Sequence, residues 1–537
     1  MVLASGIAVV RGLSLIVIGI MLVGSLFWMG IQMSDQPTPS LESAEHTGGP
    51  GEHSSQIVDD SDVVPVWKEW PKPQLALMIS GEQHGYFEPC GCTSNQMGGM
   101  ARRADLLNKL MDAGWDVRGV DLGGLSRRTT RQAQIKFEIS MQALRDLQYM
   151  AVGLGPEDLR LQPDFLLSQD IPDETGNGLQ FVSANLLFYN DPAIGTPAPF
   201  RIVEVGERRV GITSVLSETT ISSIIAPGSN TDISWASPGP AIETALQEFD
   251  AQQVDFRILL SHSLPDESRQ LAEIYPQFDV IVVAQGFSDP DPTVEPEKIG
   301  NTMMLQVGHK GKYVGVLGLY PAGEGTPVRF QLLPLERSEF NDAQQMIGHM
   351  REYQQRLRDE EIVVAEGVVG HPSGASFVGA ETCRDCHHTS YDVWVNSPHA
   401  EALDSLDPAN RREGYERLNG VSRMFDPECL SCHVTGWNAQ EHIRYRTGFL
   451  NEEFAELANE DSSLHSRLAG NQCENCHGPA SRHVELIEAG NIELAKKEVA
   501  VTLKQAKAIC YRCHDNDNSP DFDFDTYWPQ VEHYESE

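Results

Sequence analysis

Four copies of the motif Cys-x-x-Cys-His lie in the last third of the chain and constrain its fold more than any other feature. This spacing is typical of c-type haem attachment, in which two cysteines form thioether bonds to the haem and the adjacent histidine lies under the iron. The predicted attachment residues are Cys383, Cys386, Cys429, Cys432, Cys473, Cys476, Cys510 and Cys513, eight of the ten cysteines. The predicted proximal iron ligands are His387, His433, His477 and His514.

The alternative interpretation of the motifs is a pair of zinc sites, each held by four thiolates. That interpretation leaves unexplained why a histidine follows every one of the four cysteine pairs. The two other cysteines, Cys90 and Cys92, are one residue apart, so nothing remains for a wider disulfide framework. We therefore predict four covalently bound c-type haems.

The start of the chain is typical of a membrane segment. Gly12–Met33 is an uncharged, mostly apolar run of 22 residues, long enough to cross a bilayer. Arg11 precedes this run and Asp35 follows it, which by the positive-inside rule places the rest of the chain on the exported, periplasmic side. Attachment of c-type haem takes place on that side. The alternative is a cleavable signal peptide with a weak cleavage site at Val23–Ser25, but we expect an uncleaved anchor.

Length and composition indicate two folded domains joined by linkers. After the segment 1–33, residues 34–70 are rich in Pro, Ser, Gly and acidic residues and are predicted to be a disordered linker. Residues 71–335 alternate strand and helix signals and are predicted to form a multilayer α/β domain. Residues 336–376 are predicted to be a helical linker and hinge. Residues 377–537 are predicted to be a mainly α-helical domain packed around haem.

Local patterns place several elements in the α/β domain. A helix is expected over 101–113, and a charged, exposed connecting helix over 341–361. Strands are expected over 74–80, 116–122, 181–187, 200–205, 209–215, 256–261, 280–284 and 314–319.

The formal net charge of -37 argues against a nucleic-acid partner, because such binding depends on clustered Lys and Arg. The same charge favours electrostatic steering of basic partners, such as a redox protein with a positive face. We therefore expect redox partner proteins and a membrane as partners, and no nucleic acid.

The α/β domain resembles the calcineurin-like metallophosphatase domain of bacterial 5′-nucleotidases in the order of its motifs. Members of that family open with Asn-Asp-x-His-Gly, where this chain has Gly81–Gly85 with Glu82 and His84. Their Asp-x-Gly-Asp corresponds to 121–124, their Gly-Asn-His-Glu to 155–158, their Ser-His to 261–262 and their Gly-His-x-His to 284–287.

The resemblance implies that most of the ligands for two divalent cations are lost. Gly124 occupies the position of the bridging aspartate, and Pro156, Glu157, Gln285 and Phe287 occupy positions of Asn and His ligands. The ligand positions that remain are Glu82, His84 and His262. We expect a scaffold without the two-metal chemistry, with a single weak metal ion at these three residues as an alternative.

Cys90 and Cys92 are not typical of the phosphatases. Two thiols one residue apart, separated by Gly91, are suited to bind a soft metal, to close a strained disulfide or to supply a ligand to a cofactor from another domain. Buried, inert thiols are the further alternative.

The C-terminal part resembles the tetrahaem cytochrome c family that accepts electrons from hydroxylamine oxidoreductase. The resemblance is carried by the four motifs together with Ser397–Ala400, His433–Gly436, His477–His483 and Tyr527–His533. It implies that His399, His483 and His533 are distal iron ligands and that one iron lacks an obvious sixth ligand. Candidates for that position are His388, His442, His465 and Met424.

These observations predict an exported, membrane-tethered tetrahaem cytochrome that transfers electrons and carries a non-catalytic metallophosphatase-like domain. One alternative is a multihaem oxidoreductase that converts a small nitrogen or oxygen species at one open haem. A second alternative is a metal-dependent phosphoesterase. A further interpretation makes the α/β domain a docking or sensing module for the cytochrome.

Overall fold

The computed structural model describes residues 65–89, 96–171, 178–205, 208–225, 232–284, 289–321, 327–410 and 418–533. From Val63 to the end, the chain forms one compact unit. The predicted membrane segment, Cys90, Cys92, Gln285 and Phe287 lie outside the described residues. In the part of the chain that the structure describes, no helix has both the length and the apolar character needed to cross a membrane.

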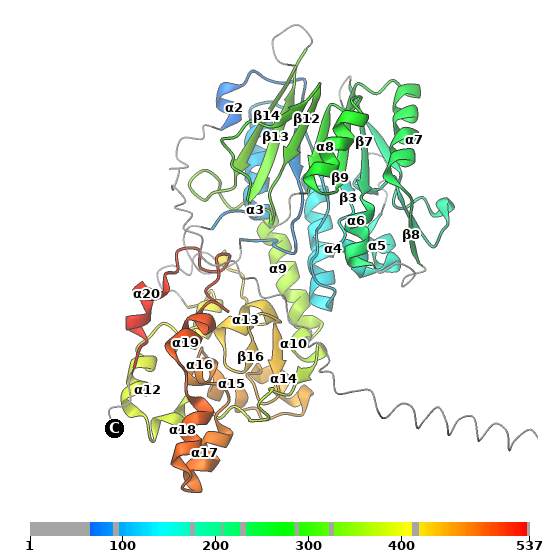
Figure 1. Ribbon diagram of the computed structural model, residues 1–537. Helices are drawn as coiled ribbons and strands as arrows, with labels where there is room; N and C mark the ends of the chain where they lie inside the picture. The colour runs from blue at the N-terminus through cyan, green and yellow to red at the C-terminus, as the bar shows by residue number, and fades with distance from the viewer. Residues whose placement is uncertain are drawn as a thin grey trace, which may run out of the picture. The chain divides into compact units, whose positions relative to one another are not determined.

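The first half of this unit contains a six-stranded mixed sheet (Figure 1). Its strand order is β14-β13-β1-β2-β3-β4, with β1 parallel to β2 and antiparallel to β13. The strands are β1 (Leu75–Ser80), β2 (Val117–Asp121), β3 (Tyr149–Gly153), β4 (Gln180–Val182), β13 (Tyr313–Leu319) and β14 (Val328–Pro334).

A second six-stranded sheet has the order β11-β12-β10-β9-β7-β6 and a parallel centre. Its strands are β6 (Phe200–Val205), β7 (Arg208–Leu216), β9 (Phe256–His262), β10 (Val280–Val283), β11 (Glu297–Ile299) and β12 (Thr302–Gln306). A separate two-stranded sheet joins β5 (Leu186–Phe188) to β8 (Ile233–Trp235).

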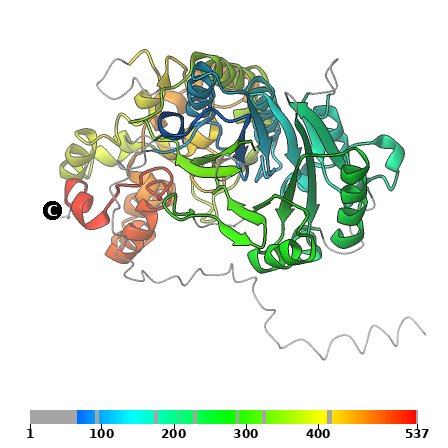
Figure 2. The same cartoon turned by 90° about the horizontal axis from the view of Figure 1, so that it is seen from above.

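The two large sheets pack face to face, as the alternation of side chains along β1 shows. Leu75, Leu77 and Ile79 belong to the core between the sheets, together with side chains of β7 and β9 such as Ile212 and Ile258. Ala76 and Met78 point to the opposite face, because successive side chains of a strand alternate. Helices α3, α4 and α9 cover that outer face, and α7 and α8 cover the outer face of the second sheet (Figure 2). The result is the predicted multilayer α/β architecture.

The first helix of this half is α2 (Val66–Glu69), which lies within the stretch expected to be a linker. Val66 of this helix is buried in the core. The others are α3 (Met100–Asp112), α4 (Arg131–Asp146), α5 (Pro163–Gln169), α6 (Glu218–Ile224), α7 (Pro238–Ala251) and α8 (Pro265–Ile274), with 3-10 turns η2 (Asp158–Leu161) and η3 (Pro192–Ile194).

Most of the predicted strands are confirmed, with ends within about one residue of the expected ends. The run 181–187, predicted as one strand, instead contributes to β4 and β5, which belong to different sheets. The predicted helix over 101–113 is α3.

The helix predicted over 341–361 exists as α9 (Gln344–Asp359), followed by α10 (Ile362–Ala365), but the expectation of an exposed helix is wrong. Its charged residues alternate with Met346, Ile347, Met350 and Leu357, which are buried against α3 and α4. Because charged residues dominate the composition of this segment, its helical stripe of core residues was not recognised from the sequence.

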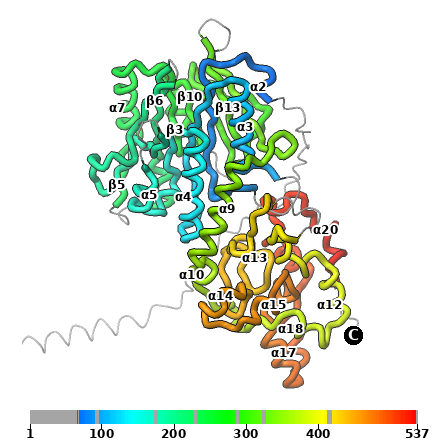
Figure 3. Tube along the Cα trace, turned by 180° about the vertical axis from the view of Figure 1, so that it is seen from behind, coloured from blue at the N-terminus to red at the C-terminus, as the bar shows by residue number. Residues whose placement is uncertain are grey.

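The C-terminal half consists of short helices, several of which are labelled in Figure 3, with 3-10 turns and a three-stranded sheet of order β15-β17-β16. A small hydrophobic core surrounds Leu430, Phe449 and Leu468. The strands are β15 (Val368–Val369), β16 (Trp437–Asn438) and β17 (Ile443–Tyr445); the helices and turns are α11 (Ala380–Arg384), α12 (His388–Val395), η4 (Leu403–Leu406), α13 (Pro427–His433), α14 (Glu452–Ala458), α15 (Leu464–Leu468), α16 (Cys473–His477), α17 (Ser481–Glu488), α18 (Ile492–Val499), α19 (Leu503–Cys510), α20 (Phe524–Tyr527) and η6 (Trp528–Gln530).

Candidate haem-binding site

Each of the four motifs lies on or at the end of a short helix, namely α11, α13, α16 and α19. In the first motif, the backbone N–H of His387 donates to the carbonyl oxygen of Cys383 at 2.9 Å, and the same 2.9 Å bond joins His514 to Cys510 in the fourth. One helical turn places residues three positions apart on the same face. Both thiols of a motif are therefore suited to reach one porphyrin edge.

Three pairs of histidine rings face each other in the C-terminal half. The ring centroids are 6.2 Å apart for His387 and His483, 6.1 Å for His399 and His514, and 5.9 Å for His477 and His533. A metal ion bound between two imidazoles at about 2 Å from each nitrogen leaves the ring centres roughly 6 Å apart. Each pair thus has the separation that suits two axial ligands of one iron.

These pairs join each predicted distal histidine to a motif histidine. His483 faces the first motif, His533 the third and His399 the fourth. Sequence alone left this pairing open.

Hydrogen bonds orient most of these rings. Nδ1 lies 2.7 Å from the carbonyl oxygen of Ala402 for His433, and 2.7 Å from that of Val499 for His477. For the distal rings, Nδ1 of His483 lies 2.9 Å from Ala495 O, and Nδ1 of His533 lies 2.9 Å from Val531 O. Because a carbonyl oxygen only accepts, each Nδ1 carries the proton and Nε2 is left as the ligand atom.

The cysteines of different motifs also lie in contact. The thiol of Cys383 is hydrogen-bonded to Cys473, and this contact, with burial, raises the pKa of Cys383. Contact with Cys513, again with burial, raises the pKa of Cys432. The first motif is thus adjacent to the third, and the second to the fourth. Burial and the charge of Cys510 raise the pKa of Cys476, so the third motif also adjoins the fourth.

Buried Glu474, inside the third motif, strengthens the first of these pairings. Its carboxylate accepts backbone N–H groups of Val378 at 3.0 Å, Gly379 at 2.8 Å and Ala480 at 2.8 Å. Val378 and Gly379 directly precede α11. The histidine pairs, the hydrogen bonds at Nδ1 and the neighbouring thiols together fit c-type haem.

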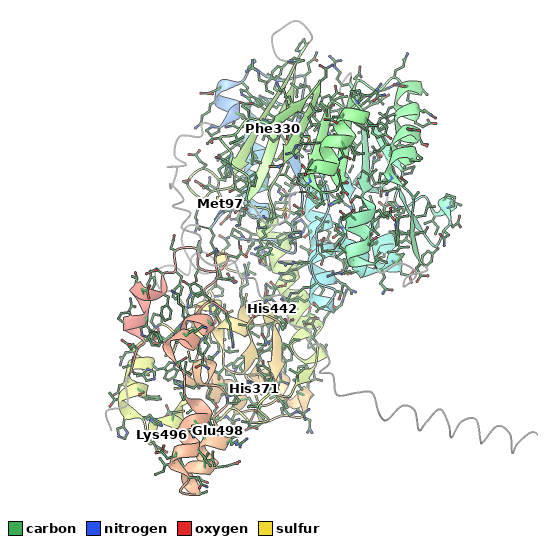
Figure 4. The ribbon with its side chains drawn as sticks, viewed as in Figure 1. Met97, Phe330, His371, His442, Lys496 and Glu498 are labelled. Atoms are coloured by element: carbon green, nitrogen blue, oxygen red, sulfur yellow. The ribbon has the colours of Figure 1, made fainter. Side chains whose placement is uncertain are left out.

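The structure also shows the environments of the four residues that the sequence offered as candidates for the sixth iron ligand. Nδ1 of His388 lies 3.1 Å from the carbonyl oxygen of Arg384, and the ring of His465 packs against Phe449 with centroids 5.2 Å apart. Met424 packs on the edge of the small hydrophobic core. His442 lies in the turn between β16 and β17 (Figure 4), where burial lowers its pKa to about 4.

In the α/β domain, the structure brings His84 next to Gly124, as the resemblance implies. A Cβ on Gly124 would lie 3.6 Å from Nε2 of His84. The carboxylate of Asp158 accepts the backbone N–H groups of Gly124 at 2.7 Å and of Gly155 at 2.9 Å. These contacts bring the loops that contain His84, Gly124 and Asp158 together.

The surroundings of His84 are cationic. Burial, and then the charges of Arg127, His309, Lys310 and His262, lower the pKa of His84 to about 3. Nε2 of His262 lies 2.6 Å from the carbonyl oxygen of Leu122 and so donates to it.

Within the described residues, no group of three or more His, Cys, Asp and Glu side chains is placed to hold a metal ion. Cys90, Cys92, Gln285 and Phe287 lie outside those residues.

Comparison with known proteins supports the haem interpretation of the C-terminal half. Residues 382–478 match the family model of cytochrome c554 and c-prime. Cytochrome c-554 of Nitrosomonas europaea is 29% identical over 108 residues, which are 20% of this chain and 39% of that protein. The family match covers the first three motifs, and the fourth follows it.

The N-terminal half is similar to solved structures of nucleotidases. The 5′-nucleotidase precursor of Thermus thermophilus has a TM-score of 0.45 and 22% identity, and the match covers 55% of this chain and 60% of that chain. The NAD nucleotidase of Haemophilus influenzae has a TM-score of 0.45 and 15% identity, with 57% and 63% covered. The chain thus spans less than two thirds of these proteins, and the likeness concerns the fold alone.

Sequence reasoning missed a set of polar contacts that joins the α/β domain to the second motif. Lys136 of α4 forms an ion pair with Glu428 of α13, and Arg423 donates to Glu88 at 2.6 Å. Gln132 of α4 donates to Asp426 at 2.7 Å. The partners are far apart in the chain, and only the polar character of each residue was visible in the sequence.

We expect Lys136→Met to destabilise the protein by about 1–3 kcal/mol, because it leaves the largely buried carboxylate of Glu428 without its cation. Guanidinium unfolding of the haem-loaded protein measures the change. Lys496→Met, on the exposed surface of α18 (Figure 4), is the matched control and should stay within about 0.5 kcal/mol of the parent. Equal stability of the two variants would show that the ion pair does not hold the two halves together.

Proposed function

We propose that this protein is an exported, membrane-tethered cytochrome that binds four c-type haems and transfers single electrons between redox partner proteins. The observation that carries the proposal is the set of three facing histidine pairs, 5.9–6.2 Å apart, each containing one motif histidine. An iron with two histidine ligands has no open position for a substrate, and therefore suits electron transfer.

Further parts of the proposal rest on the sequence. The apolar run Gly12–Met33 supports an N-terminal anchor with the folded domains in the periplasm, and the net charge of -37 supports basic redox partners. We assign the metallophosphatase-like domain to residues 71–335 and the haem domain to 377–537, with a helical linker between them. The α/β domain is a scaffold in this proposal, because Gly124 stands in place of the bridging carboxylate.

Cys90 and Cys92 stay candidate ligands for a soft metal or for a cofactor of the C-terminal half. The described residues on either side of them contact that half: Glu88 accepts from Arg423 at 2.6 Å, and Gln96 donates to the carbonyl oxygen of Asp517 at 3.2 Å. The single weak metal ion at Glu82, His84 and His262 also stays a prediction. Elemental analysis for metals other than iron tests both.

The experiment that tests the function is a measurement of haem content and carbon monoxide binding on the full chain, matured in a host that attaches c-type haem. We expect four haems per chain, and at least three of them unchanged by carbon monoxide after dithionite reduction, because their irons have two histidine ligands. Fewer than four haems would overturn the proposal.

Binding of carbon monoxide at one haem in four would favour the alternative function, an oxidoreductase acting on a small nitrogen or oxygen species. If none of the four haems bound carbon monoxide, electron transfer would be the one proposed function that remained.

A further inference from the structure

The helix that carries the second motif begins at a buried carboxylate. Asp426 is the N-cap residue of α13 and is 4% exposed. Its Oδ1 accepts the backbone N–H of Glu428 at 3.0 Å and the side-chain N–H of Gln132 at 2.7 Å. Its Oδ2 accepts the side-chain N–H of Gln354 at 2.7 Å. Three donors therefore fix this carboxylate three residues before Cys429.

Two of these donors come from outside the haem domain. Gln132 lies on α4, and Gln354 lies on α9, and both helices pack on the first sheet of the α/β domain. The exposed fractions of Gln132 and Gln354 are 3% and 6%, so water does not compete with their amides for Asp426. The hydroxyl of Tyr353 holds Gln132 in place at 2.8 Å. The α/β domain thus determines where the carboxylate lies.

The ionisable groups that face Asp426 carry charges of both signs. From its own segment they are Arg423 and Glu428; from other elements they are Lys136 of α4, Tyr353 of α9 and Glu88. Glu428 in turn faces Lys136, His442 and Arg128. Burial and the charge of Glu428 raise the pKa of Asp426, and Lys136 and Arg423 oppose this effect.

The other motif helices, all within the described residues, lack such a cap. Their N-cap residues are uncharged, namely Gly379 for α11, Gln472 for α16 and Thr502 for α19. Glu474 in the third motif is buried, but the backbone groups that bond it belong to the C-terminal half. Only α13 among the four begins at a carboxylate, and α4 and α9 hold that carboxylate.

We propose that the α/β domain tunes one haem of the cytochrome: Gln132 and Gln354 position the Asp426 carboxylate, which lowers the reduction potential of the haem at Cys429 and Cys432 and binds a proton when that haem is reduced. The inference rests on the proposed haem attachment. A fixed negative charge in a region of low dielectric constant stabilises ferric over ferrous iron, and therefore lowers the potential.

The coupled step balances in charge. One electron from the redox partner enters the haem, and one proton from water binds a carboxylate oxygen of Asp426. The added electron raises the affinity of Asp426 for this proton. Asp426 has one pKa when the haem is oxidised and a higher pKa when the haem is reduced. At pH values between these two, the reduction potential of the haem falls as pH rises. Below and above that window Asp426 keeps the same charge in both states, so the potential does not change with pH.

The test is a spectroelectrochemical titration of the full-length, haem-loaded Asp426→Asn variant at pH 5 to 9. Asparagine is also a good N-cap residue, so α13 is retained. We expect one potential of the four to rise by at least a tenfold change in its reduction equilibrium, about 59 mV, and to lose its dependence on pH. Asp461→Asn is the matched control, because Asp461 is exposed, accepts the N–H of Ser463 at 2.9 Å and carries the same charge. It should leave all four potentials unchanged.

A second variant, Gln132→Leu with Gln354→Leu, keeps the carboxylate and removes its side-chain donors. Since those donors stabilise the ionised form, the pH window of the same haem should move upward. Four haems in the parent, with potentials and pH profiles unchanged in both variants, would overturn this inference and leave the proposed function intact. Fewer than four haems in the parent would overturn both.

Discussion

Replacing Cys383 and Cys386 together by serine is expected to reduce the covalently bound haem from four per chain to three. These residues provide both thioether bonds of the first motif, and serine forms none. The loss also leaves His387 and His483, 6.2 Å apart, without the iron between them. Because this haem fills space between short helices, we also expect lower thermal stability of the C-terminal half.

Haem content per chain, from the alkaline pyridine spectrum and the iron-to-protein ratio, measures this effect. The matched control is Cys90→Ser with Cys92→Ser, which also removes two thiols but affects no motif with a following histidine. That control should keep four haems. Four haems in the first variant would mean that Cys383 and Cys386 do not attach haem.

Replacing His483 by alanine is expected to convert one haem from six-coordinate to five-coordinate. The pair His387–His483 predicts that this iron then keeps only the motif histidine. An open ferrous iron binds carbon monoxide, whereas an iron with two histidine ligands does not. The variant should therefore bind one more carbon monoxide per chain than the parent, and its oxidised form should gain a high-spin signal from one haem in four.

Electron paramagnetic resonance and carbon monoxide titration measure this change from six-coordinate to five-coordinate iron. His371→Gln is the control, because that ring packs against Phe377 and Tyr445 in the same domain and is not paired with a motif histidine. It should give the spectrum of the parent. Equal carbon monoxide binding by His483→Ala and the parent would rule out His483 as an axial ligand.

The sequence was sufficient to predict haem binding, because each attachment motif consists of contiguous residues. Each motif brings two thiols and an imidazole together within one turn of helix, and this local arrangement does not depend on the tertiary fold. The strands of the α/β domain were also readable, since alternating side chains such as Leu75 and Ala76 serve the two faces of one sheet. The pairing of His399 with the fourth motif, in contrast, depends on how loops pack and required the structure.

The contacts between the halves were beyond sequence reasoning for a similar reason. Gln132 and Asp426, which share a hydrogen bond of 2.7 Å, are separated by 294 positions in the chain. A buried glutamine has no sequence pattern that distinguishes it from a surface one. Helix α9 was misjudged as exposed because its charged residues dominate its composition, while its core side chains occupy a single stripe.

The contact between Cys383 and Cys473 has a consequence for how the protein is made. Thiols that close together are readily oxidised to a disulfide in an oxidising compartment, and Cys432 with Cys513 presents the same hazard. Such a bond would join two motifs and block thioether formation in both. The proposed haem attachment therefore requires that these thiols stay reduced until the thioether bonds have formed.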